Sequence, residues 1–192
     1  MGNLKKQTVR KKDLNSNFKT YKNKTAQDRK LFLTSNIWGI KKENDTYTAT
    51  KFSEKNNFLV NLKSEVTWNK KFVLISSNPN DYKWNDLFLE LDKKALEYSW
   101  LSFKEYQIID NRTRGNIKNI LNQASLILLT GGNTYEQNLF FHEIDLANYL
   151  INLDCPIVWI SAGAMNCSNT VLNTSKKIKK NWFTSAIGGI RT

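Results

Sequence analysis

Short apolar runs without polar alternation constrain the fold of this chain more than any other feature. They lie at 72–75, 126–129 and 157–160, and the segments between them place apolar residues three and four positions apart. A strand buried on both faces is apolar throughout, and helices that cover both faces of a sheet connect such strands in parallel. The sequence therefore predicts a three-layer α/β/α fold with a mostly parallel sheet.

The individual elements follow from the two periods of hydrophobicity. The polar, irregular segment 36–55 is predicted as a loop or a hairpin, and 56–62 as one or two helical turns. Strands are predicted at 30–35, 72–77, 103–109, 126–129 and 157–160, and helices at 84–98, 114–122 and 137–151.

Composition is that of a globular protein. With 192 residues, of which 40% are hydrophobic, the chain fits one domain with a sizeable core. No apolar run approaches the ~20 residues of a membrane span, and the N-terminus lacks the apolar core of a signal peptide. Two cysteines and one histidine form neither a disulfide framework nor a metal-ligand spacing. We therefore expect a cytoplasmic protein that uses no membrane, metal or cofactor.

Basic charge is concentrated at the two ends of the chain, whose net charge is +12. Residues 1–30 carry ten basic against two acidic residues, and residues 162–192 carry five basic and no acidic residues. A basic arm can bind phosphates through counterion release, but nucleic-acid binders usually interleave aromatic residues, and the N-terminal segment has only two. The sequence therefore favours a solvated extension at 1–29 before a single domain at 30–192, and no nucleic-acid partner is expected.

Two segments place small or polar residues directly after predicted strands. Residues 131–133 and 161–164 follow two of the apolar runs, and ligand sites in parallel sheets lie at the carboxyl ends of strands. Ser161 there has the position of a nucleophile on a sharp strand-to-helix turn, with the amides of Ala162 and Gly132 as oxyanion donors. A plain loop of small residues that starts a helix explains this pattern equally well.

Four motifs carry a resemblance to a known family. They are LFLTS at 31–35, ISSNPNDY at 75–82, GGNT at 131–134 and ISAGAMN at 160–166. Their order and spacing resemble the peptidase E (S51) family within the class I glutamine amidotransferase-like fold, which has a flavodoxin-like architecture. The resemblance runs from Lys30 to about residue 177, so it covers most of the chain.

The resemblance implies a serine peptidase-like hydrolase that acts on small peptides. An alternative role for Asn133, as a cap or turn residue, fits its position as well as substrate binding does. The resulting candidate site residues are Ser161 as the catalytic nucleophile, Gly132 and Ala162 as the oxyanion hole, and Gly131, Asn133 and Gln137 as substrate-binding residues.

Three features depart from the family pattern. Trp159 stands where the family has glycine two residues before the serine, and an indole there is expected to clash with the turn or reshape it. The catalytic histidine of the family comes from a strand further downstream, and we expect the chain, which ends at Thr192, to lack this C-terminal part. Residues 162–192 contain no His, Asp or Glu, and a serine without a base is a weak nucleophile.

The remaining candidates favour structural roles. His142 is predicted on a helix surface rather than as a base, and Cys167 as a small buried filler. Asp81 and Asp86 are predicted in a solvated loop rather than in the cleft.

Two hypotheses on function remain open at this point. One is an active serine hydrolase whose base comes from elsewhere, for instance from a partner subunit. The other is a catalytically inactive relative or truncated remnant that binds a small peptide-like ligand. In both cases an uncovered sheet edge predicts self-association into a homo-oligomer.

Overall fold

The structure is a computed structural model of the chain. It describes residues 31–37, 39–167, 172–173 and 176–177. The predicted extension at 1–29 and most of the basic C-terminal end lie outside the described residues.

Five parallel strands form the central sheet in the order β1-β7-β6-β4-β5. Counted from β4, the order β5-β4-β6-β7 is the flavodoxin-like 2-1-3-4 arrangement, and β1 takes the next position. The strands are β1 (Leu31–Thr34), β4 (Lys71–Ile75), β5 (Glu105–Ile109), β6 (Ala124–Leu129) and β7 (Ile157–Ile160).

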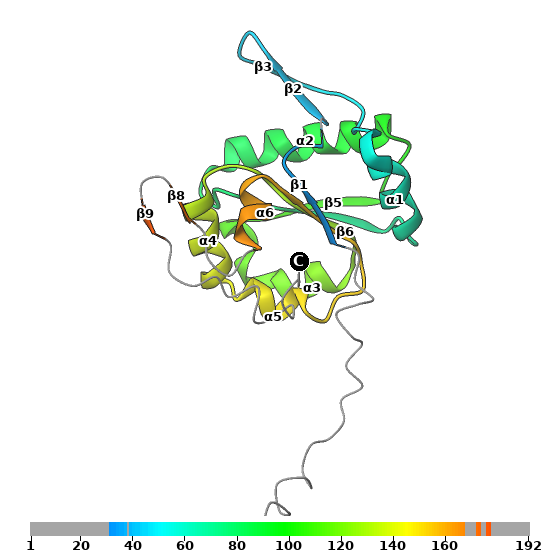
Figure 1. The fold of residues 1–192 in the computed structure, drawn as a ribbon. Helices are drawn as coiled ribbons and strands as arrows, with labels where there is room; N and C mark the ends of the chain where they lie inside the picture. Colours follow the sequence, from blue (N-terminus) through cyan, green and yellow to red (C-terminus); the bar gives the residue numbers. More distant parts are fainter. Residues whose placement is uncertain (1–30, 38, 168–171, 174–175, 178–192) are drawn as a thin grey trace, which may run out of the picture.

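Helices cover both faces of this sheet (Figure 1). One face carries α1 (Phe58–Glu65) and α2 (Tyr82–Tyr98), and the other carries α3 (Ile117–Asn122), α4 (Thr134–Glu143) and α5 (Leu146–Leu150). The short α6 (Ala162–Asn166) begins one residue after β7 and packs against α4. The predicted three-layer α/β/α fold is therefore confirmed.

No helix in the described part of the chain has the length and apolar character needed to cross a membrane.

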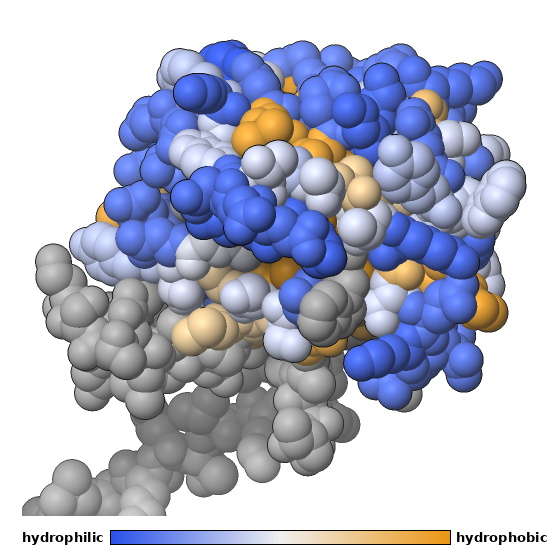
Figure 2. Space-filling model, turned by 90° about the horizontal axis from the view of Figure 1, so that it is seen from above, coloured by the Kyte–Doolittle hydropathy of each residue, from blue (hydrophilic) through white to orange (hydrophobic). Residues whose placement is uncertain are grey.

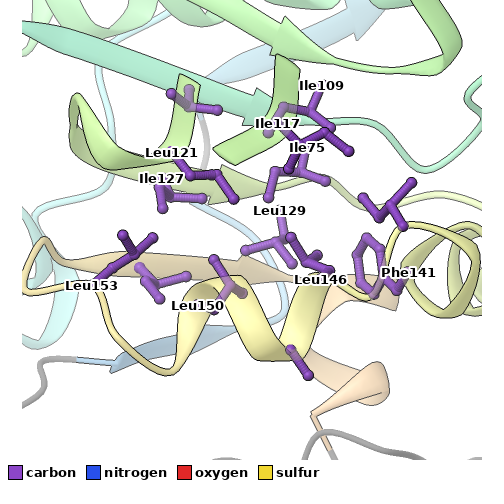
Figure 3. Close-up of a cluster of buried hydrophobic side chains, with 14 of the residues drawn as sticks. Ile75, Ile109, Ile117, Leu121, Ile127, Leu129, Phe141, Leu146, Leu150 and Leu153 are labelled. Carbon is purple, nitrogen blue, oxygen red and sulfur yellow. The ribbon is translucent and has the colours of Figure 1, made fainter. Parts of the chain in front are cut away.

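Side chains of the central strands alternate between two apolar cores. In β6, Leu126 and Leu128 face the core under α1 and α2, whereas Ile127 and Leu129 face the core under α3, α4 and α5. Figure 3 shows Ile127 and Leu129 in the second of these cores, together with Leu150 of α5. Burial of one such side chain contributes roughly 1.5–3 kcal/mol. Because positions 126–129 of the strand are all buried, this part of its sequence is apolar without alternation.

A hairpin occupies part of segment 36–55, for which the sequence predicts a loop or a hairpin. It consists of β2 (Ile40–Glu43) and β3 (Thr46–Ala49), which pair antiparallel and project above α2 in Figure 1. Asn44 and Asp45 in the turn have φ of 44° and 61°, as a two-residue type I′ turn requires.

The prediction of one helix over 137–151 is wrong. Two helices, α4 and α5, occupy this span, with a break at Asp145, whose φ is 51°. Aspartate tolerates this left-handed conformation better than most residues, and the apolar spacing does not reveal it. The predicted helix at 114–122 likewise begins as a 3₁₀ turn, η3 (Asn111–Asn116), before α3. The remaining short elements are η2 (Lys55–Asn57) and the antiparallel pair β8 (Leu172–Asn173) and β9 (Lys176–Lys177).

The direction in which the chain moves across the sheet reverses between β4 and β6. From β4 the chain passes to β5 at one edge, and from β5 it returns to β6 and continues to β7 on the other side. Open α/β sheets bind ligands in the crevice outside the carboxyl ends of strands at such a reversal. The ends of β4, β6 and β7 are therefore the place to look for a site.

Candidate active site

Small residues occupy the carboxyl ends of β4, β6 and β7. Ser77 comes two residues after β4, Gly131 and Gly132 lie in the loop after β6, and Ser161 follows β7 directly. A methyl group on Gly131 would lie 3.1 Å from the Cβ of Ser161, and one on Gly132 would lie 2.7 Å from the Cβ of Ser77. The two glycines thus lie between the two serines, and their bare backbone lets the strand ends approach closely. We call these four residues the serine–glycine row.

Ser161 forms a strained turn between β7 and α6. Its φ of 50° and ψ of −109° fall where residues with a side chain are rarely found. Its N–H donates to the carbonyl of Thr34 at the end of β1 (2.9 Å), and its carbonyl accepts from the N–H of Met165 (2.9 Å). The side chain is exposed. The structure thus contains a sharp strand-to-helix turn at this serine, whereas its chemical role stays a prediction.

The tight contact in this turn lies at Gly163 and not at Trp159. A methyl group on Gly163 would lie 2.9 Å from the carbonyl oxygen of Leu129, so α6 approaches β6 through bare backbone. The indole of Trp159 is fully buried in the core under α3, α4 and α5. The expected clash between the indole and the turn is not observed, because that core accommodates the ring.

The two predicted oxyanion donors come from different loops. Ala162 is the first residue of α6, where backbone N–H groups have no acceptor within the helix. Gly132 has a φ of 146°, a conformation that a residue with a Cβ rarely adopts. One donor therefore belongs to the turn of Ser161 and the other to the loop after the neighbouring strand.

Gln137 of α4 holds the loop after β6 in place through a hydrogen bond. Its side chain is fully buried, its Nε2 donates to the carbonyl of Thr130 (2.8 Å), and its Oε1 accepts from Nδ2 of Asn166 (3.0 Å). Asn166 also accepts from Nδ2 of Asn138 (3.2 Å), so the network joins α4 to α6. Both ends of its amide are thus bonded within the protein, and the predicted role of Gln137 in substrate binding stays a prediction.

Asn133 caps α4. Its Oδ1 accepts from the N–H of Tyr135 (3.0 Å) and of Glu136 (3.3 Å), which satisfies two N–H groups at the start of the helix. The capping alternative is thus confirmed. Asn133 is also exposed, and Gly131 is half-buried beside Ser161, so substrate contact by these two residues stays a prediction.

A second polar network fixes the loop after β4. The buried Ser76 hydroxyl donates to Oδ1 of Asn85 (2.7 Å), and Nδ2 of Asn85 donates to Asp110 (3.2 Å). Asp110 is fully buried and pairs with Arg112 (2.6 Å), which also pairs with the exposed Asp86 (2.6 Å). Hydrogen bonds from Arg112 lower the pKa of Asp86 below its usual value. The network holds the ends of β4 and β5 against α2.

A cavity of about 460 Å³ lies between α2, the loop after β1 and the sheet. Its wall on α2 consists of one helix face, with lining residues at intervals of three and four positions. Ser77, Gly131 and Gly132 also line it, so the cavity is continuous with the serine–glycine row. Its volume is in the range of small-molecule sites. The lining residues on α2 are Asp81, Trp84, Asn85, Phe88 and Asp92.

Two of these side chains are set by local contacts. Asp81 caps α2 by accepting from the N–H of Trp84 (3.3 Å), so it belongs to the helix start rather than to a solvated loop. The rings of Trp84 and Phe88 pack against Tyr47 of the hairpin, with centroids 5.3 and 5.6 Å apart. The hairpin therefore helps to form the outer wall of the cavity.

Asp92 is a candidate functional residue that the sequence analysis missed. It is 4% exposed, and among the described residues it has no hydrogen-bond or ion-pair partner. Burial raises its pKa to about 7. The available signal was its spacing, since Trp84, Phe88 and Asp92 follow one another at four-residue intervals on the inner helix face.

Within the described part of the chain, the Ser161 hydroxyl forms no hydrogen bond with a base. His142 is exposed near the end of α4, as predicted, and Cys167 is buried, so its pKa lies well above its usual value. The same residues contain no group of three or more His, Cys, Asp or Glu able to hold a metal ion.

A second cavity, of about 490 Å³, lies at the amino ends of β4, β5 and β6. Lys70, Lys104 and the exposed Trp68 line it. The serine–glycine row lies at the other ends of these strands, so the second cavity is not part of the candidate site.

Comparison with known proteins identifies no family. No protein-family model matches the chain, and no curated protein matches it. Among solved structures, the chain is similar to a peptidase from an acI-B1 Actinobacterium, with a TM-score of 0.48 and 16% sequence identity. The match covers 80% of this chain and 64% of that structure, so the chain spans less than two thirds of its length. The resemblance to the peptidase E family stays a prediction.

Proposed function

We propose that the chain is a serine-type hydrolase of small peptide-like substrates, with Ser161 as its nucleophile. The observation that carries the proposal is the exposed serine at φ 50°, on the turn between β7 and α6 and beside the bare backbone of Gly131. Strain of this kind costs on the order of 1–3 kcal/mol and clusters at active sites. The motifs that resemble the peptidase E family indicate the same residue.

In the proposed reaction, Ser161 Oγ attacks the carbonyl carbon of an amide and gives its proton to a base. The carbonyl oxygen becomes an oxyanion, which the N–H groups of Ala162 and Gly132 stabilise by hydrogen bonds. The C–N bond then breaks, the leaving amine takes the proton, and water hydrolyses the acyl-enzyme to regenerate the serine. Loss of one oxyanion donor of this kind lowers kcat roughly 100- to 1000-fold.

Binding without turnover is the second candidate function. It is favoured by the absence of a base bonded to Ser161 among the described residues, together with the single histidine of the chain, which is exposed on α4. An active enzyme therefore needs a base that is not among the described contacts of Ser161.

Hydrolysis of a pool of di- and tripeptides tests the proposal. The release of free amino groups is compared between the full chain, Ser161→Ala and the control Ser64→Ala, whose serine is exposed on α1 and bonds only its own helix in the described contacts. We expect turnover by the wild type and the control and its loss in Ser161→Ala. Equal turnover by all three proteins would contradict a role for Ser161. No turnover by any of them, with peptide binding retained, would support the second candidate.

A further inference from the structure

The cavity beside α2 is acidic in a basic chain. Among its described lining residues the ionisable side chains are Asp81 and Asp92, and neither lysine nor arginine is present, although the chain has a net charge of +12. The two acids differ in their contacts. Asp81 accepts from the N–H of Trp84, whereas Asp92 has no partner in the described part of the chain. Asp92 is therefore the acid of the cavity whose carboxylate has no described partner.

The position of Asp92 makes this charge costly. Its side chain is 4% exposed, and an ionised carboxylate removed from water is destabilising unless it is paired. A ligand that brings a positive charge supplies the missing partner. Binding of such a ligand pairs the carboxylate of Asp92, which has no described partner in the protein alone.

The shape of the cavity selects an elongated ligand. Asp81 and Asp92 are eleven positions apart on one helix, which corresponds to about 16 Å along its axis. The wall between them carries the rings of Trp84 and Phe88, with Ile37 and Ile40 also in the lining. A small inorganic cation would leave this apolar space empty, whereas an alkyl or aryl-alkyl chain would fill it.

We propose that this cavity binds the primary ammonium group of an elongated, largely apolar organic amine, with Asp92 as its counter-ion. The other end of the ligand lies towards Ser77 and Gly132, which line the cavity and belong to the serine–glycine row. The inference does not depend on hydrolysis at Ser161. If the serine is active, the cavity defines the preferred substrate as one with a cationic chain.

Other charged side chains on the elements around α2 are engaged elsewhere. On α2 itself, Glu90 and Lys94 are exposed. On the hairpin, on β4 and β5, in the segment before α1 and on α2, the contacts are Lys41–Glu43, Lys42–Asp45, Lys71–Glu105, Lys51–Glu54 and Lys93 with the ring of Tyr106. Burial alone therefore raises the pKa of Asp92 to about 7, and the carboxylate that an ammonium group requires forms as the pH rises through 7.

Calorimetric binding of 4-phenylbutylamine, with 4-phenylbutanol as its neutral counterpart, tests the inference on the full chain. At pH 8 we expect the wild type to bind the amine at least about ten-fold more tightly than the alcohol, as a charge-assisted hydrogen bond provides. At pH 6 the preference should fall about ten-fold, because a carboxyl group with a pKa of about 7 is then mostly protonated.

Two variants complete the experiment. Asp92→Asn keeps the shape of the side chain and should remove the preference for the amine, whereas Glu90→Gln, which removes one exposed acid from the same helix, should keep it. Equal affinity for amine and alcohol at pH 8, a preference that survives in Asp92→Asn, or no binding of either compound would overturn the inference. The pH dependence in the wild type tests it without any variant. Ser161→Ala should bind like the wild type, so failure of hydrolysis at Ser161 is a separate result.

Discussion

Gly132 and Ser161 hold backbone conformations that most residues avoid, and both lie at the carboxyl end of the sheet. Gly132 meets the requirement by having no side chain, while Ser161 keeps its side chain and carries the strain. Asp92 adds a third cost close by, a buried acid without a partner among the described residues. These three residues concentrate unfavourable local energies around one crevice, as functional sites commonly do.

Gly132→Ala is predicted to destabilise the protein, because the new methyl group would lie 2.7 Å from the Cβ of Ser77 at a φ of 146°. We expect the free energy of unfolding to fall by about 2 kcal/mol or more in urea denaturation. Gly115→Ala is the control, since a methyl group there meets nothing within 4 Å, and it should change stability little. Equal losses in the two variants would contradict the close contact at Gly132.

Asp92→Asn is predicted to change how stability depends on pH. The pKa of Asp92 is about 7 in the folded protein and near its ordinary value of 3.8 in the unfolded chain, so the folded state holds a proton that the unfolded state has lost between these pH values. The free energy of unfolding of the wild type therefore falls as the pH rises from about 4 to about 7. In Asp92→Asn the free energy of unfolding should not show this fall, because asparagine does not titrate.

The comparison is made by urea unfolding without ligand at pH 5 and pH 8. Relative to the wild type, Asp92→Asn should gain about 3 kcal/mol between these two values. A difference between variant and wild type that is the same at both pH values would mean that burial does not raise the pKa of Asp92 in the folded protein.

At the scale of elements, two polar networks hold the crevice in shape. One joins α4 to α6, the helix that follows the turn of Ser161, through Gln137 and Asn166. The other joins the ends of β4 and β5 to α2 through Asn85 and Asp110, and it includes Ser76, the neighbour of Ser77. Both networks tie a loop at the carboxyl end of the sheet to a helix, so helices help to position the serine–glycine row.

Asn166→Ala is predicted to loosen α6. The fully buried Asn166 bonds the carbonyl of Thr134 as well as Gln137 and Asn138, and its removal leaves buried polar groups without their partner. We expect a loss of roughly 2–3 kcal/mol in thermal or urea unfolding. Asn119→Ala removes a single exposed side-chain hydrogen bond and should cost little. A loss no larger than this control would show that the network does not stabilise α6.

Arg112→Leu is predicted to be more destabilising than Arg114→Leu. Arg112 neutralises Asp110, which is fully buried, whereas Arg114 pairs with the exposed Glu143. Removing the first arginine leaves an unpaired buried carboxylate and should cost about 2 kcal/mol or more, while an exposed pair contributes about 0–1 kcal/mol. Chemical denaturation of both variants measures the difference, and similar losses would argue against a structural role for the Asp110 network.

At the scale of the whole molecule, basic charge and the crevice are separated along the chain. The part between the two basic ends carries fourteen basic and fifteen acidic residues, and the cavity beside α2 is lined by acids only among the described residues. Figure 2 shows the face with α2 and the hairpin as mostly hydrophilic, with hydrophobic residues in small separate groups. The binding proposed for this face therefore relies on the cavity and not on a broad apolar surface.

The sequence predicts the centre of this molecule better than its edges. The apolar runs of β4, β6 and β7 identify their strands because both faces of each strand are buried. The break at Asp145 was missed, because one backbone angle leaves the apolar spacing unchanged. The hairpin could be stated only as one of two alternatives, since its strands are short and mostly exposed.

The site divides in the same way. The positions of Ser161 and of the loop after β6 could be predicted, because residues that directly follow buried parallel strands lie at the carboxyl end of the sheet. The surroundings of Gln137 and Asp92 could not be predicted, because they depend on contacts between segments far apart in the sequence, such as the loop after β1 and the middle of α2.

Covalent labelling by a fluorophosphonate measures whether Ser161 is an activated nucleophile, as we propose. The intact mass of the folded chain is measured after reaction and compared with that of Ser161→Ala and Ser64→Ala. We expect a single adduct on the wild type and on Ser64→Ala and none on Ser161→Ala. An unlabelled wild type in a sample shown to be folded, or an adduct that persists in Ser161→Ala, would contradict it.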